Sequence, residues 1–395
     1  MTERVVIVEG VRTPIGRFGG TLKNVSSGFL AAHVITALLN KTGVHPEQVE
    51  EVILGEVRQT TESSNVARVA TIRAKLPVEV PAFTINRLCA SGMQAIASGV
   101  QQIQSGHAQI VIAGGTESMS NAPIYLRNSR FGEGNPYLVD SHLETGQQPK
   151  EIYGEDLGMG ITAENVAVDY QISREDQDQF ALESQRRAAK AIEEGVFHDE
   201  IVPIEVTAGK KTIIFDTDEH PRPDTTMEKL KQLKPAFRKD GTVTAGNTCG
   251  RNDGASAVLL MTEQTAHQNN LTPMAAIVDW AVCGVDPRVM GIGPIPAIKK
   301  LLERTNKTIE DIDLFEINEA FASQAVAVQR ELGIDMEKLN VNGGAIALGH
   351  PVGATGNRIV VTLMHELRRT GKRYGIASLC VGGGQGMAIL IENLS

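Results

Sequence analysis

Residues 92–115 read GMQAIASGVQQIQSGHAQIVIAGG, and this stretch decides the predicted fold. Apolar side chains in its first half recur at spacings of three and four residues: Met93, Ile96, Val100 and Ile103. This periodicity predicts an amphipathic helix over residues 92–104. Residues 110–113 then form an unbroken apolar run that ends at two glycines, which is typical of a buried strand. A helix that leads into a buried strand favours α/β layering.

The second half of the chain repeats this pattern. A strand is expected at residues 314–317, as at 52–54, and both follow a short acidic segment. A helix at 356–367 and a strand at 376–379 come next, and that strand leads into three glycines. A twofold internal duplication is the simplest interpretation, with a chance likeness of two α/β segments as the alternative.

The region between the halves has a different composition. Residues 121–148 are rich in Gly, Asn, Pro and Ser, and residues 221–240 are irregular and more basic. Between them, residues 173–194 predict a helix with Ser173 as its N-cap. We therefore expect an inserted loop domain. The predicted division is an N-terminal half at 1–120 and 248–272, a loop domain at 121–247, and a C-terminal half at 273–395.

Composition narrows the class of protein. The chain has 395 residues, of which 42% are apolar, enough for the core of two or three domains. It carries 38 Lys and Arg against 47 Asp and Glu, and this acidic balance argues against general nucleic-acid or membrane-surface binding. Its four cysteines form no zinc-type cluster and suit a reducing compartment. Because no secretory signal, bilayer-length apolar run or C-terminal retention signal is apparent, a cytoplasmic protein is expected.

Cys89 is the first candidate for chemistry, in the segment NRLCASG at 86–92. It lies just before the predicted helix, and the positive end of a helix favours the thiolate. Ser91 and Gly92 allow a tight turn that brings amide N–H groups near the sulfur, where they could hold an oxyanion. The alternative is a buried, inert cysteine.

His350 and Cys380 lie in similar glycine-rich segments, GGAIALGHPVGATG at 343–356 and SLCVGGG at 378–384. An imidazole is the usual base for a thiol, and a second cysteine held nearby could move a proton to or from a carbon acid. A loop histidine at a helix start and a small core cysteine are the alternatives. Asn318 follows the strand at 314–317 and could orient a water or donate to an oxyanion, or serve as a helix N-cap.

A basic stretch at 222–239 could pair with the phosphates of a nucleotide tail, with a solvated surface helix as the alternative. The small-residue turn at 244–250 would let an extended ligand approach the backbone. Cys249 and Cys283 have no acid–base neighbour in sequence, and both are interpreted as structural. No strand–GxGxxG–helix arrangement supports a nucleotide-dependent dehydrogenase.

Taken together, these segments resemble the thiolases, which comprise acetyl-CoA acetyltransferases and 3-ketoacyl-CoA thiolases (acetyl-CoA C-acyltransferases). The matching pieces span essentially the whole chain and occur in the family's order. Besides the segments around Cys89, His350 and Cys380, they are RTPIG at 12–16, AGGTESM at 113–119, MGITAEN at 159–165, PAF at 235–237, TVTAGN at 242–247, GVDP at 284–287 with MG at 290–291, and NEAF at 318–321.

The resemblance implies a five-layered αβαβα fold of two similar halves, with a loop domain over the active site, in a homodimer or homotetramer. It implies that Cys89 is the acylated nucleophile, that His350 activates it and that Cys380 exchanges the proton on the acetyl carbon. Asn318 would hold a water that stabilises the thioester enolate together with His350, and the amides of Cys89 and Gly382 would form a second oxyanion hole. The residues implied for CoA and acyl binding are Arg222, Phe237, Met159, Met290, Ala245 and Phe321.

Under this resemblance the reaction is reversible thiolysis of 3-ketoacyl-CoA or Claisen condensation of acetyl-CoA, as in fatty acid metabolism. CoA is substrate and product, and no metal or other cofactor is expected. Gly158 and Cys249 stand where short-chain members often carry His and Ser, and the segment 146–156 also differs, which favours a broader 3-ketoacyl range slightly over acetoacetyl-CoA synthesis. The alternatives are a non-catalytic acyl-CoA- or lipid-binding relative and another condensing enzyme of the superfamily; Cys380 argues against the synthases that use two histidines.

Overall fold

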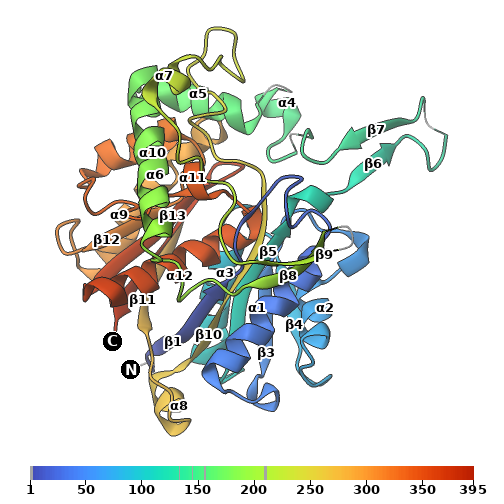
Figure 1. Ribbon diagram of the computed structural model, residues 1–395, viewed down its shortest axis with the longest axis vertical. Helices are drawn as coiled ribbons and strands as arrows, with labels where there is room; N and C mark the ends of the chain where they lie inside the picture. The colour runs from blue at the N-terminus through green and yellow to red at the C-terminus, as the bar shows by residue number, and fades with distance from the viewer. Residues whose placement is uncertain (1–2, 133, 145, 155–156, 209–210) are drawn as a thin grey trace.

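The computed structural model describes residues 3–132, 134–144, 146–154, 157–208 and 211–395. Across these residues, ten strands form one large mixed sheet (Figure 1). Nine of them lie side by side in this order: β12 (Leu314–Ile317), β13 (Tyr374–Val381), β14 (Gln385–Asn393), β11 (Ala275–Gly284), β1 (Val5–Arg12), β10 (Asn252–Thr262), β5 (Val111–Ser118), β3 (Glu51–Gly55) and β4 (Ala82–Ile85). The tenth, β2 (Gly16–Arg17), pairs with β10 off this path.

The sheet consists of two halves with the same topology, which confirms the predicted duplication. In the first half β3 is parallel to β4 and β5, and β10 and β1 follow antiparallel. In the second half β12 is parallel to β13, and β14 and β11 follow antiparallel. A parallel bridge from Phe315 to Leu339 takes the place of the β3–β4 pair. The halves meet where Val6 of β1 lies opposite Ala276 of β11.

Helices complete five layers, as the fold prediction states. Two central helices, α3 (Ser91–Gln104) and α12 (Val352–Thr370), contact each other and lie between the two half-sheets. Helices α1 (Ser27–Thr42) and α2 (Val66–Arg73) cover the outer face of the first half, and α9 (Pro294–Thr305) and α10 (Ala322–Leu332) that of the second. The order helix, sheet, helix, sheet, helix is the αβαβα architecture.

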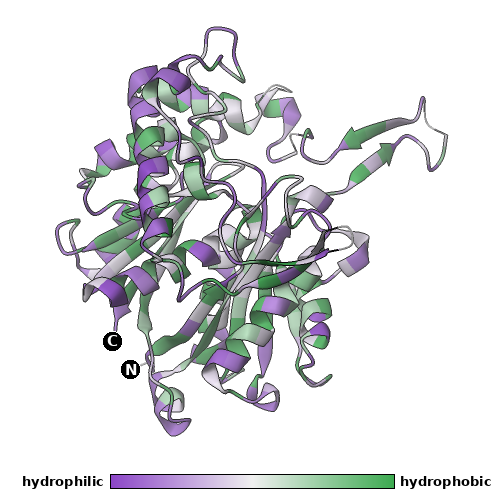
Figure 2. Cartoon of the chain, viewed as in Figure 1, coloured by the Kyte–Doolittle hydropathy of each residue, from purple (hydrophilic) through white to green (hydrophobic). Residues whose placement is uncertain are grey.

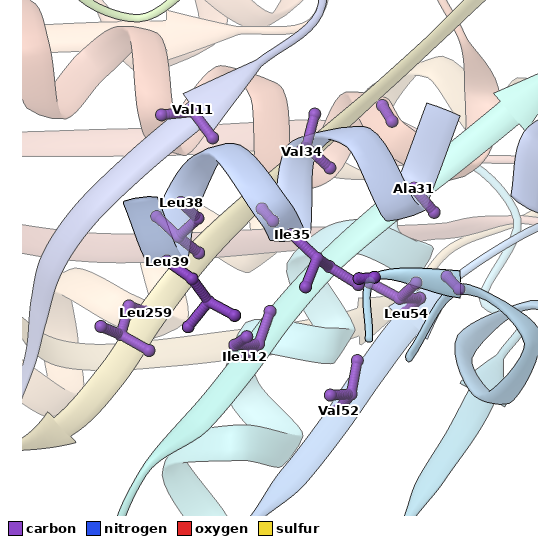
Figure 3. Close-up of a cluster of buried hydrophobic side chains, with 14 of the residues drawn as sticks. Val11, Ala31, Val34, Ile35, Leu38, Leu39, Val52, Leu54, Ile112 and Leu259 are labelled. Atoms are coloured by element: carbon purple, nitrogen blue, oxygen red, sulfur yellow. The ribbon is translucent and has the colours of Figure 1, made fainter. Parts of the chain in front are cut away.

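The outer layer of the first half shows why these segments form these elements. In α1, Ile35, Leu38 and Leu39 recur on one face and are buried against β3, β5 and β10 (Figure 3). Gly43 ends the helix with φ +71°, and its N–H donates to Leu39 O. Truncating one such leucine to alanine lowers the free energy of unfolding by about 2–5 kcal/mol. The helix layer therefore stabilises the half-sheet that it covers.

The region between the halves carries short elements and one long helix, α6 (Arg174–Glu193). Ser173 caps α6 by accepting the Asp176 N–H, as predicted. The sequence did not predict the hairpin β6 (Ile124–Arg127)–β7 (Tyr137–Asp140), which projects from the body of the molecule (Figure 1). This region also contains the hairpin β8 (Ile204–Ala208)–β9 (Lys211–Phe215) and the helices α4 (Lys150–Tyr153), α5 (Met159–Asp169) and α7 (Met227–Lys231). Two further short helices lie outside it: α8 (Glu263–Gln268) and α11 (Ala345–Leu348).

The predicted domain boundaries stay a prediction. The helices within the described ranges are all too short or too polar to cross a membrane.

Candidate active site

A cavity of about 440 Å³ gathers residues from both halves and from the region between them. Cys89 comes from the first half and His350 and Cys380 from the second. The other predicted site residues that line it are Met159, Phe237, Met290 and Phe321. A cavity of this size suits a small-molecule ligand, and it joins side chains that are far apart in the sequence, since Cys380 follows Cys89 by 291 positions.

The turn that holds Cys89 is fixed by the side chain of Ser91. Its Oγ donates to Leu88 O at 2.6 Å and accepts the Arg87 N–H at 2.9 Å. Leu88 takes a positive φ of +47°, which a leucine adopts only when its surroundings impose it. Helix α3 then begins at Ser91, so Cys89 lies at the N-terminal end of a central helix, as the sequence predicts.

Two glycines let the central helices approach closely. A Cβ at residue 92 in α3 would stand 2.8 Å from Asn357 N in α12. A Cβ at Gly356 in α12 would stand 2.6 Å from Met93 N in α3. Only glycine fits at both positions, and the close crossing brings the Cys89 turn beside the loop that carries His350.

Opposing effects act on the Cys89 thiol. Burial raises its pKa, while the backbone N–H groups of Gly382 and of Cys89 itself favour the thiolate and oppose that rise. Because burial dominates, Cys89 is a thiol at neutral pH and needs a base before it can attack. The same two N–H groups are the pair that the resemblance assigns to an oxyanion hole.

His350 is buried and has the properties of that base. Its Nδ1 lies 2.6 Å from Thr355 Oγ1, and the Thr355 hydroxyl donates its one proton to Pro351 O at 2.9 Å. Nδ1–H is therefore the donor to Thr355, and Nε2 keeps its lone pair. Burial, and secondarily the charge of Arg358, lowers the pKa of His350 to about 3, so the ring is neutral at pH 7.

The backbone before His350 depends on Gly349. Gly349 has φ +104°, and a Cβ there would stand 2.5 Å from Cγ of Asn252. Asn252 Oδ1 accepts the His350 N–H at 2.9 Å, and its Nδ2 donates to Gly16 O at 2.9 Å. The histidine is thus held by β10 of the first half although it belongs to the second.

Cys380 lies near the end of β13 and is fully buried. Burial raises the pKa of its thiol well above the ordinary value, and neighbouring Cys89 and Cys249 raise it further. Gly383 and Gly384 follow with φ +79° and +86°, which lets the chain turn directly after the strand. The thiol keeps its proton and can give it to a carbanion.

Asn318 is buried and is not among the residues that line the cavity, and its backbone N–H donates to Ser378 O at 2.9 Å, two residues before Cys380. Neither Oδ1 nor Nδ2 of its side chain has a hydrogen-bond partner among the residues that the structure describes. Leaving such a group unsatisfied costs about 1–3 kcal/mol, so the carboxamide is suited to hold a water or a substrate oxygen. The alternative role as helix N-cap is wrong, because Phe321 caps α10.

The remaining predicted residues fall in different places. Gly382 reaches the site through its N–H, whereas Arg222 and Ala245 are exposed and do not line this cavity. Cys249, interpreted from the sequence as structural, does line it, and its N–H donates to Ala320 O at 3.1 Å. Burial, and then the neighbouring Cys89, raises the pKa of the Cys249 thiol to about 12, so it stays protonated.

Sequence reasoning also missed Thr355, Arg58 and Arg251. Thr355 contacts His350 directly, and both arginines line the cavity. The sequence offered a signal only for Thr355, which follows His350 by five residues at the start of a predicted helix. The arginines gave none, since single surface-type residues in turns do not reveal which way they point.

The model of the thiolase N-terminal domain matches residues 5–264, and that of the thiolase C-terminal domain matches residues 271–393. An acetyl-CoA acetyltransferase of Syntrophomonas wolfei is 50% identical over 402 residues, with all of both chains covered.

Solved structures give the same picture. The acetyl-CoA acetyltransferase of Bacillus anthracis is 51% identical with a TM-score of 0.96, over 100% of this chain and 99% of the other. Human mitochondrial 3-ketoacyl-CoA thiolase in complex with CoA is 46% identical with a TM-score of 0.94, again over 100% and 99%. Both likenesses extend over the two halves and the region between them.

Proposed function

Because the chain belongs to the thiolase family, we propose that it cleaves 3-ketoacyl-CoA by thiolysis, and runs the reverse Claisen condensation, through an acyl group on Cys89. It is an acyltransferase of that family. The observation that carries the residue assignment is the cavity itself, which joins Cys89, His350 and Cys380.

In the first step the Cys89 sulfur attacks the C3 carbonyl of the 3-ketoacyl group, and His350 Nε2 takes the thiol proton. The C2–C3 bond breaks, and the acyl group stays on Cys89. The electron pair of the broken bond goes to the acetyl-CoA fragment, which leaves as an enolate. Cys380 gives its proton to C2 of that enolate, and acetyl-CoA departs. In the second step the Cys380 thiolate takes the proton of the CoA thiol, and the CoA sulfur attacks the acyl-enzyme. The shortened acyl-CoA leaves, and the Cys89 sulfur takes its proton back from His350.

Each negative charge that develops has a donor near it. The N–H groups of Cys89 and Gly382 point at the sulfur and suit the oxyanion on the acyl carbon. A water held by Asn318, together with His350, would stabilise the enolate oxygen. Donors already in place need no reorganisation during the reaction, which is why such sites accelerate acyl transfer.

An apolar wall suits the acyl-CoA arm. The rings of Phe237 and Phe321 pack edge to face at 6.3 Å, and Met159 and Met290 belong to the same cluster as Phe321. A Cβ at Gly160 would overlap the Phe237 ring, so that wall depends on a glycine. We propose that CoA enters here and that Arg222 and Ala245 contact its outer part. CoA serves as substrate and product, with no other cofactor.

The exposed hairpin supports the proposal of a homo-oligomer. Its strands are coloured largely as hydrophobic in Figure 2. The side chains of Phe131 and Leu138 are 82% and 71% exposed. Large exposed apolar surface marks an interaction site, and a second copy of this chain is the proposed occupant, in a dimer or tetramer. Light scattering of Phe131→Asp beside the unchanged protein tests this, since a smaller particle is expected. The cytoplasm is the proposed compartment.

The function is tested by CoA-dependent thiolysis of acetoacetyl-CoA beside a longer 3-ketoacyl-CoA, with Cys89→Ala as the control. Comparable or faster cleavage of the longer substrate would support the broader 3-ketoacyl range, and cleavage of acetoacetyl-CoA alone a short-chain acetyltransferase. No cleavage of either by a folded protein would revive the binding-protein alternative.

A further inference from the structure

Two arginines line the same cavity as the reacting groups. The side chains of Arg58 and Arg251 form no ion pair and no hydrogen bond with any residue that the structure describes. A guanidinium group is always charged and presents a planar fork of donors that matches a carboxylate. Arg58 is half-buried and Arg251 is exposed, and neither guanidinium is neutralised by a described protein group, so an anionic ligand in the cavity can bind both.

The backbone of Arg58 is held in place by a buried carboxylate. Glu117 Oε1 accepts the Arg58 N–H at 2.9 Å, and Oε2 accepts the Val57 N–H at 3.1 Å. Glu117 Oε2 also accepts the Gly353 N–H at 2.8 Å, in the first turn of α12. Arg58 is therefore fixed to the helix that begins just after His350, and its charge opposes the rise in the pKa of the Cys89 thiol.

Arg251 directly precedes β10, whose first residues lie at the same edge of the sheet as the ends of β3 and β5. Its backbone forms a parallel bridge with His350, and its carbonyl accepts the Phe18 N–H at 3.0 Å. The guanidinium lies 5.7 Å from the centre of the Phe18 ring. His142 packs edge-on against the same ring, with the two ring centres 5.7 Å apart. Arg251, Phe18 and His142 thus form one contiguous rim.

His142 lines the same cavity as the two arginines. Burial lowers the pKa of His142, and the charges of Arg251 and Arg58 lower it further. His142 Nε2–H donates to Met119 O at 2.8 Å, which fixes the ring. Since His142 is neutral at pH 7, the positive charge of this wall comes from the arginines.

The nearby carboxylates already have partners. Glu144 lines the cavity, but Arg127 binds it through two nitrogens at 2.7–3.1 Å. Glu117 accepts three backbone N–H groups. These engaged carboxylates leave the charge of the two arginines available to a ligand.

The phosphates of CoA are the other source of negative charge, and the geometry disfavours them. Arg58 and Arg251 line the same cavity as Cys89 and His350, and the backbone of Arg251 forms a bridge with that of His350. In an acyl-CoA the phosphates are separated from the thioester by the whole pantetheine arm. The group that can reach these arginines is the far end of a short acyl chain.

We propose that Arg58 and Arg251 form a carboxylate subsite, so that the substrates of this enzyme include 3-ketoacyl-CoA thioesters whose acyl chain ends in a carboxylate. This inference rests on the proposed thiolase activity and deepens it. The terminal carboxylate binds the two guanidinium groups while C3 lies against the Cys89 sulfur, and the product is an acyl-CoA that keeps the carboxylate.

The test compares thiolysis of 3-ketoadipyl-CoA with that of 3-ketohexanoyl-CoA, which has the same chain length and ends in a methyl group. The measured quantity is the ratio of the two kcat/KM values, because it does not depend on the fraction of active protein. Charge-assisted hydrogen bonds are worth about 1.5–3 kcal/mol, so we expect a ratio of about 10 or more in favour of the carboxylate. Arg58→Leu and Arg251→Leu should each lower that ratio about tenfold, and Arg58→Lys should lower it less.

A ratio near one that neither substitution changes would overturn the proposal. So would an equal rise in KM for every acyl-CoA and for CoA itself, since that would assign the arginines to the phosphates. Binding of adipyl-CoA and hexanoyl-CoA to Cys89→Ala, measured by calorimetry, separates this inference from the thiolase activity. Tighter binding of adipyl-CoA without turnover of any substrate by the unchanged enzyme would uphold the subsite and refute the activity, whereas equal binding would refute the subsite.

Discussion

Gly92 of α3 lies against Asn357 of α12 so closely that a Cβ at residue 92 would stand 2.8 Å from Asn357 N. Asn357 is itself fixed, because its Oδ1 accepts the Ser256 hydroxyl at 2.5 Å and its Nδ2 donates to Ala113 O at 3.2 Å. The helix backbone therefore cannot yield. This contact sets the distance between the turn that carries Cys89 and the loop that carries His350.

Gly92→Ala should lower both stability and activity. Overpacking a rigid contact costs about 1–3 kcal/mol, and a small shift of Cys89 from the base lowers kcat further. Urea unfolding and thiolysis are the measurements. Gly284→Ala is the matched control, because the nearest atom to a Cβ there is at 3.9 Å. Equal behaviour of the two variants would contradict the role of the helix crossing.

Cys380→Ala should separate the two halves of the reaction. Cys89 keeps its base, so the protein should still take up an acetyl group from acetyl-CoA. The proton on the acetyl carbon has no donor or acceptor, so exchange of acetyl-CoA methyl protons in D₂O and thiolysis should fall by about 100-fold or more. Equal loss of acylation and of exchange would show that Cys380 does not have this separate task.

Thr355→Val should impair His350 without removing it. The hydroxyl accepts Nδ1–H at 2.6 Å, and without it the ring loses the contact that sets its tautomer. Because a lost buried partner costs about 1–3 kcal/mol, kcat/KM should fall about tenfold or more, and Thr355→Ser should restore most of it. Thr71 is the control, since it is equally buried and donates to Ala67 O at 2.8 Å without touching a histidine. A similar loss of activity in Thr71→Val would mean that the effect is merely structural.

His350 should make the protein less stable in acid. Its pKa is about 3 in the folded chain and about 6.5 when unfolded, so the unfolded state binds more protons between these values. Stability is unaffected above pH 6.5 and falls as the pH drops toward 3, by about 2 kcal/mol at pH 5. Urea unfolding at pH 7 and pH 5 measures this, and the fall should be smaller in His350→Gln.

The comparison with His350→Gln is needed because other buried groups act in the opposite direction. Burial raises the pKa of Glu56 and of Glu316 to about 8, so both lose stabilisation as the pH rises. Glu56 and Glu316 are present in both the unchanged protein and His350→Gln, so their contributions cancel when the two changes in stability with pH are compared. An identical fall in both would mean that the imidazole is not held neutral by the fold.

Helices and strands with a regular apolar pattern were predicted best. The errors came at glycines, which either turn the chain or make room for a neighbouring segment. We expected the strand at 110–113 to end at Gly114 and Gly115, yet β5 continues to Ser118. These glycines make no turn there. They admit close neighbours, since a Cβ at Gly114 would collide with Ser256 O and one at Gly115 with Gly353 O. Local sequence does not show whether a glycine bends the chain or makes room for another segment.

Among the site residues, those within distinctive segments could be anticipated, and those placed by long-range packing could not. The Cys89 turn is closed by Ser91, two residues away, so its geometry is local. Cys249 reaches the cavity because its N–H bonds to Ala320 O, a contact between distant segments. Arg58 owes its position to Glu117 in another strand. No periodicity or spacing records such contacts.

The central claim is that Cys89, and not one of the other two cysteines at the cavity, carries the acyl group. Mass spectrometric peptide mapping after incubation with acetoacetyl-CoA and an acid quench tests it most directly. The account predicts an acetyl group on the Cys89 peptide of the unchanged protein, and on that of Cys380→Ala when acetyl-CoA replaces acetoacetyl-CoA, because that variant does not cleave the carbon–carbon bond. An acetyl group on the Cys249 or Cys380 peptide, or no acetylated peptide while thiolysis proceeds, would contradict it.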